Sequence, residues 1–92
     1  MRVWAASGAG LVFLAGCAVP PQGVSPEDLN EYRVAVASIG CEMVTEADYL
    51  PVELQAGLTR EQSTAITSYM LAAGEAERMV NGGVKLKTGA CA

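Results

Sequence analysis

The chain has 92 residues, of which 10 are acidic and 6 are basic, and it contains no histidine. Its formal net charge of −4 repels nucleic acids. The absence of histidine removes the side chain that most often acts as a general base or metal ligand. We therefore expect no nucleic-acid partner, no catalytic residue, no bound metal and no cofactor.

The N-terminal stretch has the three parts of a secretory signal. Arg2 supplies a positive charge, residues 3–14 form an uncharged and largely apolar run, and small residues follow. A helix of about a dozen residues rises roughly 18 Å, whereas the hydrocarbon core of a bilayer is about 30 Å thick. A cleaved signal is therefore a better interpretation than a transmembrane anchor.

The end of this stretch resembles the lipobox of bacterial lipoproteins, with Leu14, Ala15, Gly16 and Cys17 matching at every position. The resemblance implies that the Cys17 sulfur receives a diacylglycerol and that a peptidase then cuts before this residue. Two or three acyl chains attach a protein stably to a membrane. An Asp after the cysteine would imply retention at the inner membrane, so Ala18 favours the periplasmic leaflet of the outer membrane. The alternative is an ordinary secretory signal followed by a chance cysteine.

Cleavage before Cys17 would divide the chain into three parts. Residues 1–16 are the signal peptide, residues 17–25 are the lipidated cysteine with a Pro-rich tether, and residues 26–92 are a small periplasmic-type globular domain. Seven tether residues in polyproline geometry reach roughly 20 Å. We therefore expect the domain to stay close to the membrane.

Two cysteines, Cys41 and Cys91, remain once Cys17 is assigned to the lipid. An even number in an oxidising compartment favours a disulfide, which small domains often need. Closing a loop of this length stabilises the fold by roughly 4 kcal/mol in the chain-entropy account. Two free thiols are the first alternative. A redox pair is less favoured, because redox motifs usually place their cysteines close together in the sequence.

A first helix is predicted over residues 26–39. Ser25 and Asp28 form a capping box, and Pro26 suits the first helical position. Gly40 is a plausible C-terminal stop. The following side chains recur at helical spacing and should face the core: Leu29, Tyr32, Val36 and Ile39.

A second helix is predicted near residues 49–56, with Gly57 after it. Thr45 and Asp48 both suit the N-cap position. We prefer Asp48, because a helix that started at Thr45 would contain Pro51 beyond its first turn and lose a hydrogen bond. The expected apolar contacts of this helix are Tyr49, Leu50, Leu54 and Val52.

The third helix should follow a tight corner at residues 57–59. Thr59 and Gln62 form a capping box, and Gly74 should end the helix after about residue 73. Its expected apolar stripe is Ala65, Ile66, Tyr69, Met70 and Ala73.

The pattern of the last segment predicts a β-hairpin with strands at residues 75–80 and 84–88. A three-residue turn would pair Val80 with Val84 and set Glu77 against Lys87. A two-residue turn would set Arg78 against Lys85, which is a like-charge clash. We prefer the three-residue turn, with Val80, Val84 and Leu86 toward the core.

The fold class expected is therefore small α+β, with three short helices followed by a C-terminal β-hairpin, and with one disulfide. This order resembles a winged helix-turn-helix. The DNA binding common in that family is not expected, because the third helix carries Arg60 as its only base.

Two functions are compatible with this outline. The first is a membrane-anchored envelope lipoprotein that acts as a non-enzymatic accessory subunit of a membrane complex, with an envelope protein as partner. Its contact surface should expose apolar side chains around the second helix: Tyr49, Leu50, Val52 and Leu58. The alternative is a free-standing lipoprotein that binds cell-wall polymer or another ligand. No small-molecule substrate is expected.

Two lysines, Lys85 and Lys87, lie on one face of the last predicted strand. They could meet an anionic partner. The alternative, which we prefer, is that their charges keep an exposed edge strand from pairing with another chain.

Overall fold

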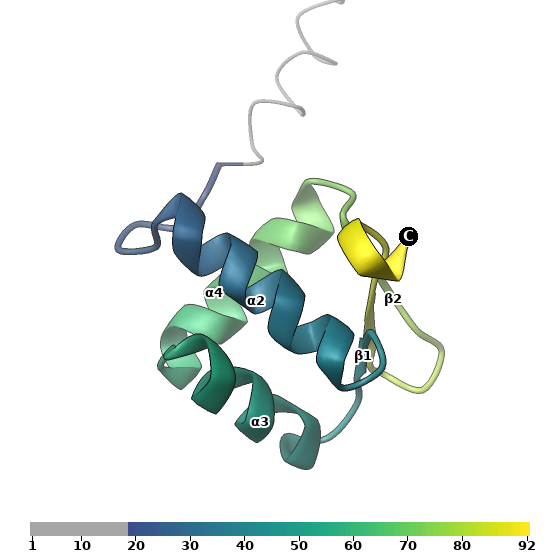
Figure 1. Cartoon of the computed structure of the whole chain (residues 1–92). Coiled ribbons are helices and arrows are strands. Elements are labelled where there is room, and N and C mark those ends of the chain that lie inside the picture. The colour runs from purple at the N-terminus through teal and green to yellow at the C-terminus, as the bar shows by residue number, and fades with distance from the viewer. Residues whose placement is uncertain (1–18) are drawn as a thin grey trace, which may run out of the picture.

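The computed structural model describes residues 19–92, so the predicted signal peptide and Cys17 lie outside the described part of the chain (Figure 1). The three predicted helices are present, together with a three-stranded antiparallel sheet, which confirms the small α+β class. The elements are α2 (Pro26–Ser38), β1 (Glu42–Met43), α3 (Glu46–Ala56), α4 (Arg60–Ala72), β2 (Ala76–Arg78), β3 (Val84–Leu86) and the short helix η1 (Gly89–Cys91). No helix within residues 19–92 has the length and hydropathy needed to cross a membrane.

Capping boxes begin α2 and α4 where the sequence predicts them. In α2 the Asp28 backbone N–H donates to Ser25 Oγ at 3.0 Å, and Asp28 Oδ2 accepts from the Ser25 backbone N–H at 3.0 Å. In α4 the same exchange joins Thr59 and Gln62, at 3.0 and 2.9 Å. These side chains satisfy backbone donors that a helix start otherwise leaves unpaired.

The three long helices end in the same way. A backbone N–H returns to the carbonyl five residues earlier, from Cys41 to Val36 in α2 and from Glu75 to Met70 in α4. In α3 the same bond runs from Leu58 to Glu53, at 3.0 Å. A glycine with positive φ precedes each donor, and this is the Schellman arrangement. The predicted stops at residues 40, 57 and 74 are confirmed.

The preferred start of the second helix was wrong. The N-cap of α3 is Thr45, and Pro51 lies inside the helix. The Asp48 carboxylate accepts hydrogen bonds from the backbone N–H groups of Val44 and Thr45, at 2.7 and 3.0 Å. These two charge-assisted bonds outweigh the single backbone bond that Pro51 cannot make.

The sheet has the order β1-β3-β2, so β3 is its central strand. β1 was not predicted, because two residues are too few to show an alternating pattern. It pairs with β3 through Glu42 opposite Lys85 and Met43 opposite Val84. The predicted uninterrupted run of helices is therefore interrupted by a strand between α2 and α3.

The hairpin register differs from both predicted registers. Glu77 lies opposite Lys85 and Arg78 lies opposite Val84, so the turn consists of residues 80–82. Val80 is consequently fully exposed instead of facing the core. Gly83 is the reason. A Cβ atom there would lie 2.8 Å from the Met43 carbonyl oxygen, so this glycine is needed in the strand pairing and not in the turn.

The core lies between the helices and the sheet. Val84 and Leu86 face it as predicted, because a shift of two residues leaves the facing of a strand unchanged. Tyr32 is also buried, and its hydroxyl lies 2.6 Å from Thr67 Oγ1. Burial raises the pKa of Tyr32 to about 12. The other large and fully buried hydrophobic side chains of the core are Val36, Met43, Val52, Ile66 and Met70, and Leu29 and Leu58 are buried beside them.

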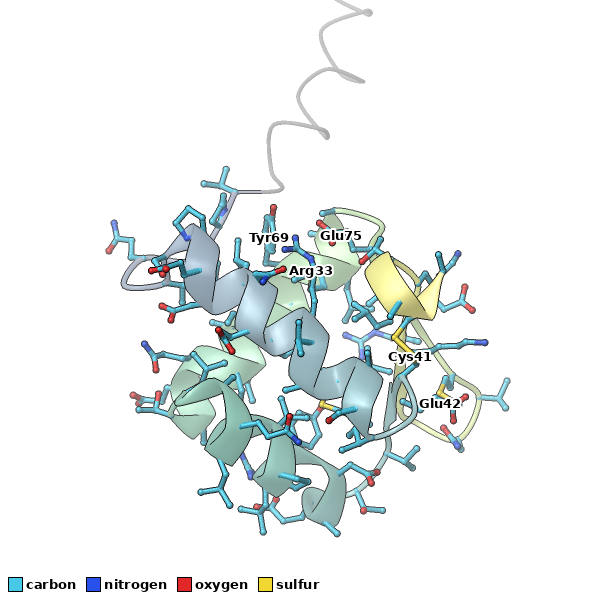
Figure 2. The ribbon with its side chains drawn as sticks, in the orientation of Figure 1. Arg33, Cys41, Glu42, Tyr69 and Glu75 are labelled. Carbon is cyan, nitrogen blue, oxygen red and sulfur yellow. A yellow bond between two sulfur atoms is a disulfide. The ribbon has the colours of Figure 1, made fainter. Side chains whose placement is uncertain are left out.

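A disulfide joins Cys41 to Cys91, as predicted, with their Cα atoms 5.7 Å apart (Figure 2). It links the end of α2 to η1 across a sequence separation of 50 residues. Cys41 has a φ of 72°, which is the left-handed region that residues other than glycine seldom adopt. The backbone at this residue is therefore held in an unfavourable conformation by its surroundings.

We expect the double variant Cys41→Ala/Cys91→Ala to lose roughly 4 kcal/mol of unfolding free energy, because the unfolded chain regains the freedom of a long loop. The companion variant Cys41→Gly/Cys91→Ala should lose about 1 kcal/mol less, because glycine adopts positive φ without penalty. Urea unfolding followed by circular dichroism measures both losses. Equal stability of the two variants would contradict the assigned strain at Cys41.

Candidate functional site

Helix α3 presents an apolar face to solvent. Leu54 is 83% exposed and Leu50 is 49% exposed. Ala47 is also exposed, and spacings of three and four residues place these side chains on one side of the helix. We call Ala47, Leu50 and Leu54 the outer face of α3.

The predicted contact surface around the second helix is only partly correct. Leu50 is exposed as expected, but Val52 and Leu58 are buried core residues and Tyr49 is half-buried. Val52 is two residues from Leu50, so it points to the opposite side of the helix. Leu50 and Leu54 were both also expected among the apolar contacts of the helix, and both are exposed; Leu54 is the most exposed leucine of the described residues. The spacing alone shows that Leu50 and Val52 face different sides, but it does not show which side faces the core.

Arg60 fixes one flank of α3 to α4. Its guanidinium donates to both carboxylate oxygens of Glu46, at 2.9 and 2.7 Å, and to the carboxylate of Glu53. It also lies 5.4 Å from the ring centre of Tyr49. The hydrogen bond from Arg60 lowers the pKa of Glu53, which accepts a further bond from Ser63 Oγ at 2.7 Å. These charges are paired with one another and hold the scaffold.

A second ion pair joins α2 to the chain after α4 (Figure 2). Arg33 Nε and Nη2 donate to the two carboxylate oxygens of Glu75, at 3.0 and 3.2 Å. Thr88 Oγ1 lies 3.1 Å from the same carboxylate. The hydrogen bond from Arg33 lowers the pKa of Glu75. Both side chains are more than two thirds buried, so water screens this pair less than a surface pair.

The lysines of the hairpin lie beside acidic residues. Lys85 is flanked by Glu42 on β1 and by Glu77 on β2. Lys87 Nζ lies 3.2 Å from Glu77 Oε1. Since β3 is the central strand, Lys85 does not blunt a sheet edge, and that interpretation was wrong. The acids on both sides also weaken the case for an anion site on this face.

A shallow cavity of about 200 Å³ lies between α4 and the hairpin. Its volume is below the roughly 300–1,000 Å³ typical of small-molecule sites. Its lining combines hydroxyl groups, one arginine and apolar side chains: Tyr49, Thr64, Thr67, Ser68, Leu71, Arg78, Gly82 and Val84. The sequence patterns did not single out this site, because its residues come from four separate elements, α3, α4, β2 and β3, and from the hairpin turn.

The described residues offer little chemistry beyond these contacts. Within residues 19–92, histidine, cysteine, aspartate and glutamate side chains form no group of three that could hold a metal ion. Two of the hydroxyls on α4 are engaged locally, since Ser63 Oγ donates to Glu53 and Thr67 Oγ1 donates to the Ser63 carbonyl. Cys17, the predicted lipidation residue, lies outside the described part of the chain.

Comparisons of this chain with protein-family models, with curated proteins and with solved structures found no match. The function of the outer face of α3 and of the cavity is therefore inferred from their own geometry.

The Arg33–Glu75 pair makes stability depend on pH. The pKa of Glu75 in the folded protein lies below its usual value of 4.5, so the folded state binds fewer protons than the unfolded chain near that pH. The stabilisation is complete above this value and is lost as the pH falls through the folded pKa. We expect Glu75→Gln to cost about 1–2 kcal/mol at pH 7 and much less in acid.

Chemical denaturation at a series of pH values from 7 downward measures this dependence. The control is Glu31→Gln, an exposed carboxylate that makes no ion pair within residues 19–92. This control should keep the wild-type acid slope. A Glu75→Gln protein with an unchanged acid slope would show that the pair does not stabilise the fold.

Proposed function

We propose that the protein is a lipid-anchored envelope lipoprotein whose small domain acts as a non-enzymatic accessory subunit of a membrane complex. The lipobox-like segment that ends at Cys17 would supply the anchor. The observation that carries the proposal is the outer face of α3, where Leu50 and Leu54 are left in solvent.

A protein partner would gain from covering this face. Burying a leucine side chain from water stabilises a complex by about 1.5–3 kcal/mol, and two leucines on one helix face can bury together. Amphipathic helices commonly lay such a face into a groove of a partner. Leu50 and Leu54 have the spacing that this mode of binding requires.

The position of α3 supports a protein partner over the membrane that holds the anchor. Figure 1 shows α3 at the end of the domain away from the point where the described chain begins. The linking segment is also short. In the described part of the predicted tether, residues 19–24, the extended geometry is interrupted by a turn, in which the Val24 N–H donates to the Pro21 carbonyl at 3.3 Å. Gln62 Nε2 then donates to the Gly23 carbonyl at 3.2 Å, which fastens this turn to α4.

The charge of α3 indicates the chemistry of the partner. The helix contains Glu46, Asp48 and Glu53 and no basic residue. The Glu46 side chain is largely exposed in spite of its pairing with Arg60. A complementary partner would offer an apolar groove with a basic rim, since complementary charges at a rim steer and orient association.

We also infer a winged-helix-like arrangement for the domain. A Gly-containing corner joins α3 to α4, the β2–β3 hairpin follows α4, and β1 pairs with β3. In DNA-binding members of that fold the third helix carries the bases that contact the groove. Here Arg60, the only base of α4, is engaged by two glutamates. We propose that the arrangement serves protein contacts.

The alternative function is a free-standing lipoprotein that binds cell-wall polymer or another ligand. One observation favours it, namely the cavity beside α4 with its hydroxyl groups and Arg78.

We expect Leu50→Ser/Leu54→Ser to raise the dissociation constant of the partner at least tenfold. The reason is that the loss of two buried leucines costs more than about 1.4 kcal/mol of binding free energy. The test is an affinity pull-down of tagged full-length protein from crosslinked, detergent-solubilised membranes. Val34→Ser is the matched control, because Val34 is an exposed valine on α2. Retention of a stoichiometric companion by the double leucine variant, or its absence with the wild-type protein, would contradict the proposal.

The anchor is tested separately. Mass spectrometry of the mature N-terminal peptide should show a chain that starts at Cys17 and carries acyl mass. Cys17→Ser should abolish that mass and shift the protein out of the membrane fraction, because the acyl chains supply the attachment. An intact segment of residues 1–16 in the mature protein would overturn the lipoprotein assignment.

A further inference from the structure

Arg78 occupies an unusual place in the sheet. Its pairing opposite Val84 puts it on the same face as Ala76, Val84 and Leu86, which are all buried. Arg78 is the last residue of β2, so it lies on the core-facing side of the sheet but at the margin of the core. There its side chain lines the cavity beside α4. Within residues 19–92 it forms no ion pair.

The cavity offers further donors near this guanidinium. Ser68 and Tyr49 also line the cavity, and the hydroxyl group of neither makes a hydrogen bond to another described residue. Thr64 is less available, because its Oγ1 donates to backbone carbonyls of α4. One unpaired arginine and two residues with hydroxyl groups free to bond a ligand therefore line the same small space.

The remainder of the lining is apolar. Leu71 and Val84 contribute hydrocarbon surface beside these donors. A ligand that satisfies both parts has an anionic group next to a small aliphatic group. The guanidinium fork matches a carboxylate, to which it can donate two parallel hydrogen bonds.

Size and charge narrow the ligand class. A volume of about 200 Å³ accommodates the end of a chain more readily than a whole metabolite. The domain is acidic overall, and a single unpaired arginine balances one negative charge but not two. A singly charged carboxylate is therefore favoured over a phosphate group.

We propose that the cavity between α4 and the hairpin binds the C-terminal carboxylate of a peptide that ends in a small aliphatic residue, with Arg78 holding the carboxylate. Such a terminus occurs at the end of a protein chain and, with D-residues, in the peptides of bacterial cell walls. This inference is independent of the proposed docking through the outer face of α3, and it gives a ligand class to the cavity on which the alternative function rests.

The test is an NMR titration of ¹⁵N-labelled full-length protein in detergent micelles. The probes are acetyl-Ala-Ala with a free carboxylate, its C-terminal amide, and the D-enantiomer of the acid. We expect saturable shifts at the amides of Ser68, Leu71 and Arg78, with a dissociation constant of about 1 mM for so small a contact. The amide should bind at least tenfold more weakly, because it lacks the charge.

Two matched variants locate the binding. Arg78→Gln should raise the dissociation constant of the acid peptide at least tenfold. Lys85→Gln, which removes the same charge from the other face of the hairpin, should change that dissociation constant less than twofold. Preference for the D-peptide would assign the ligand to the cell wall, and preference for the L-peptide would assign it to a protein terminus. Equal binding of acid and amide, unchanged binding by Arg78→Gln, or no saturable shift would overturn the proposal. None of these outcomes depends on the leucines of α3.

Discussion

Cys41 is the residue at which three parts of this small fold are joined. Its backbone N–H closes the end of α2 by donating to the Val36 carbonyl, and its own carbonyl accepts from the Leu86 N–H. Its sulfur is bonded to Cys91 in η1. A helix, the central strand and the C-terminus are therefore fixed at a single position, and the positive φ of Cys41 is the cost of that geometry. A domain of this size has a modest core and depends on such a constraint.

The remaining polar groups are largely satisfied within the domain. Arg60 joins α3 to α4 through two glutamates, and Arg33 joins α2 to the chain after α4 through Glu75. Several exposed side chains within residues 19–92 have no internal partner. Among them, Leu50 and Leu54 lie together on one helix face, and Arg78, which makes no ion pair, lines the cavity beside α4. We therefore propose that recognition of other molecules involves these two places, which lie on different elements.

Local chemistry made much of the fold predictable. Capping residues and glycines fixed the helix ends to within a residue or two at most positions, because each acts through contacts a few residues away. The errors came from contacts that no local pattern contains. The approach of Gly83 to Met43 sets the hairpin register, and it depends on the unpredicted strand β1. The start of α3 was misjudged because the bonds made by Asp48 outweigh the defect at Pro51. Which leucines of α3 are exposed depends on how the helix packs, which the spacing alone does not give. The disulfide was predictable because two cysteines remain once Cys17 is assigned to the lipid. The cavity could be found only from the tertiary structure, which brings its lining residues together.

The most direct test of the central claim is site-specific photocrosslinking in native membranes. A photoreactive residue at Leu54 should yield one discrete protein adduct, whereas the same residue at Val34, on α2, should yield none, because only the outer face of α3 is proposed to be covered. Adducts from both positions alike, or adducts only to lipid from Leu54, would contradict the account of α3 as a docking face for a protein partner.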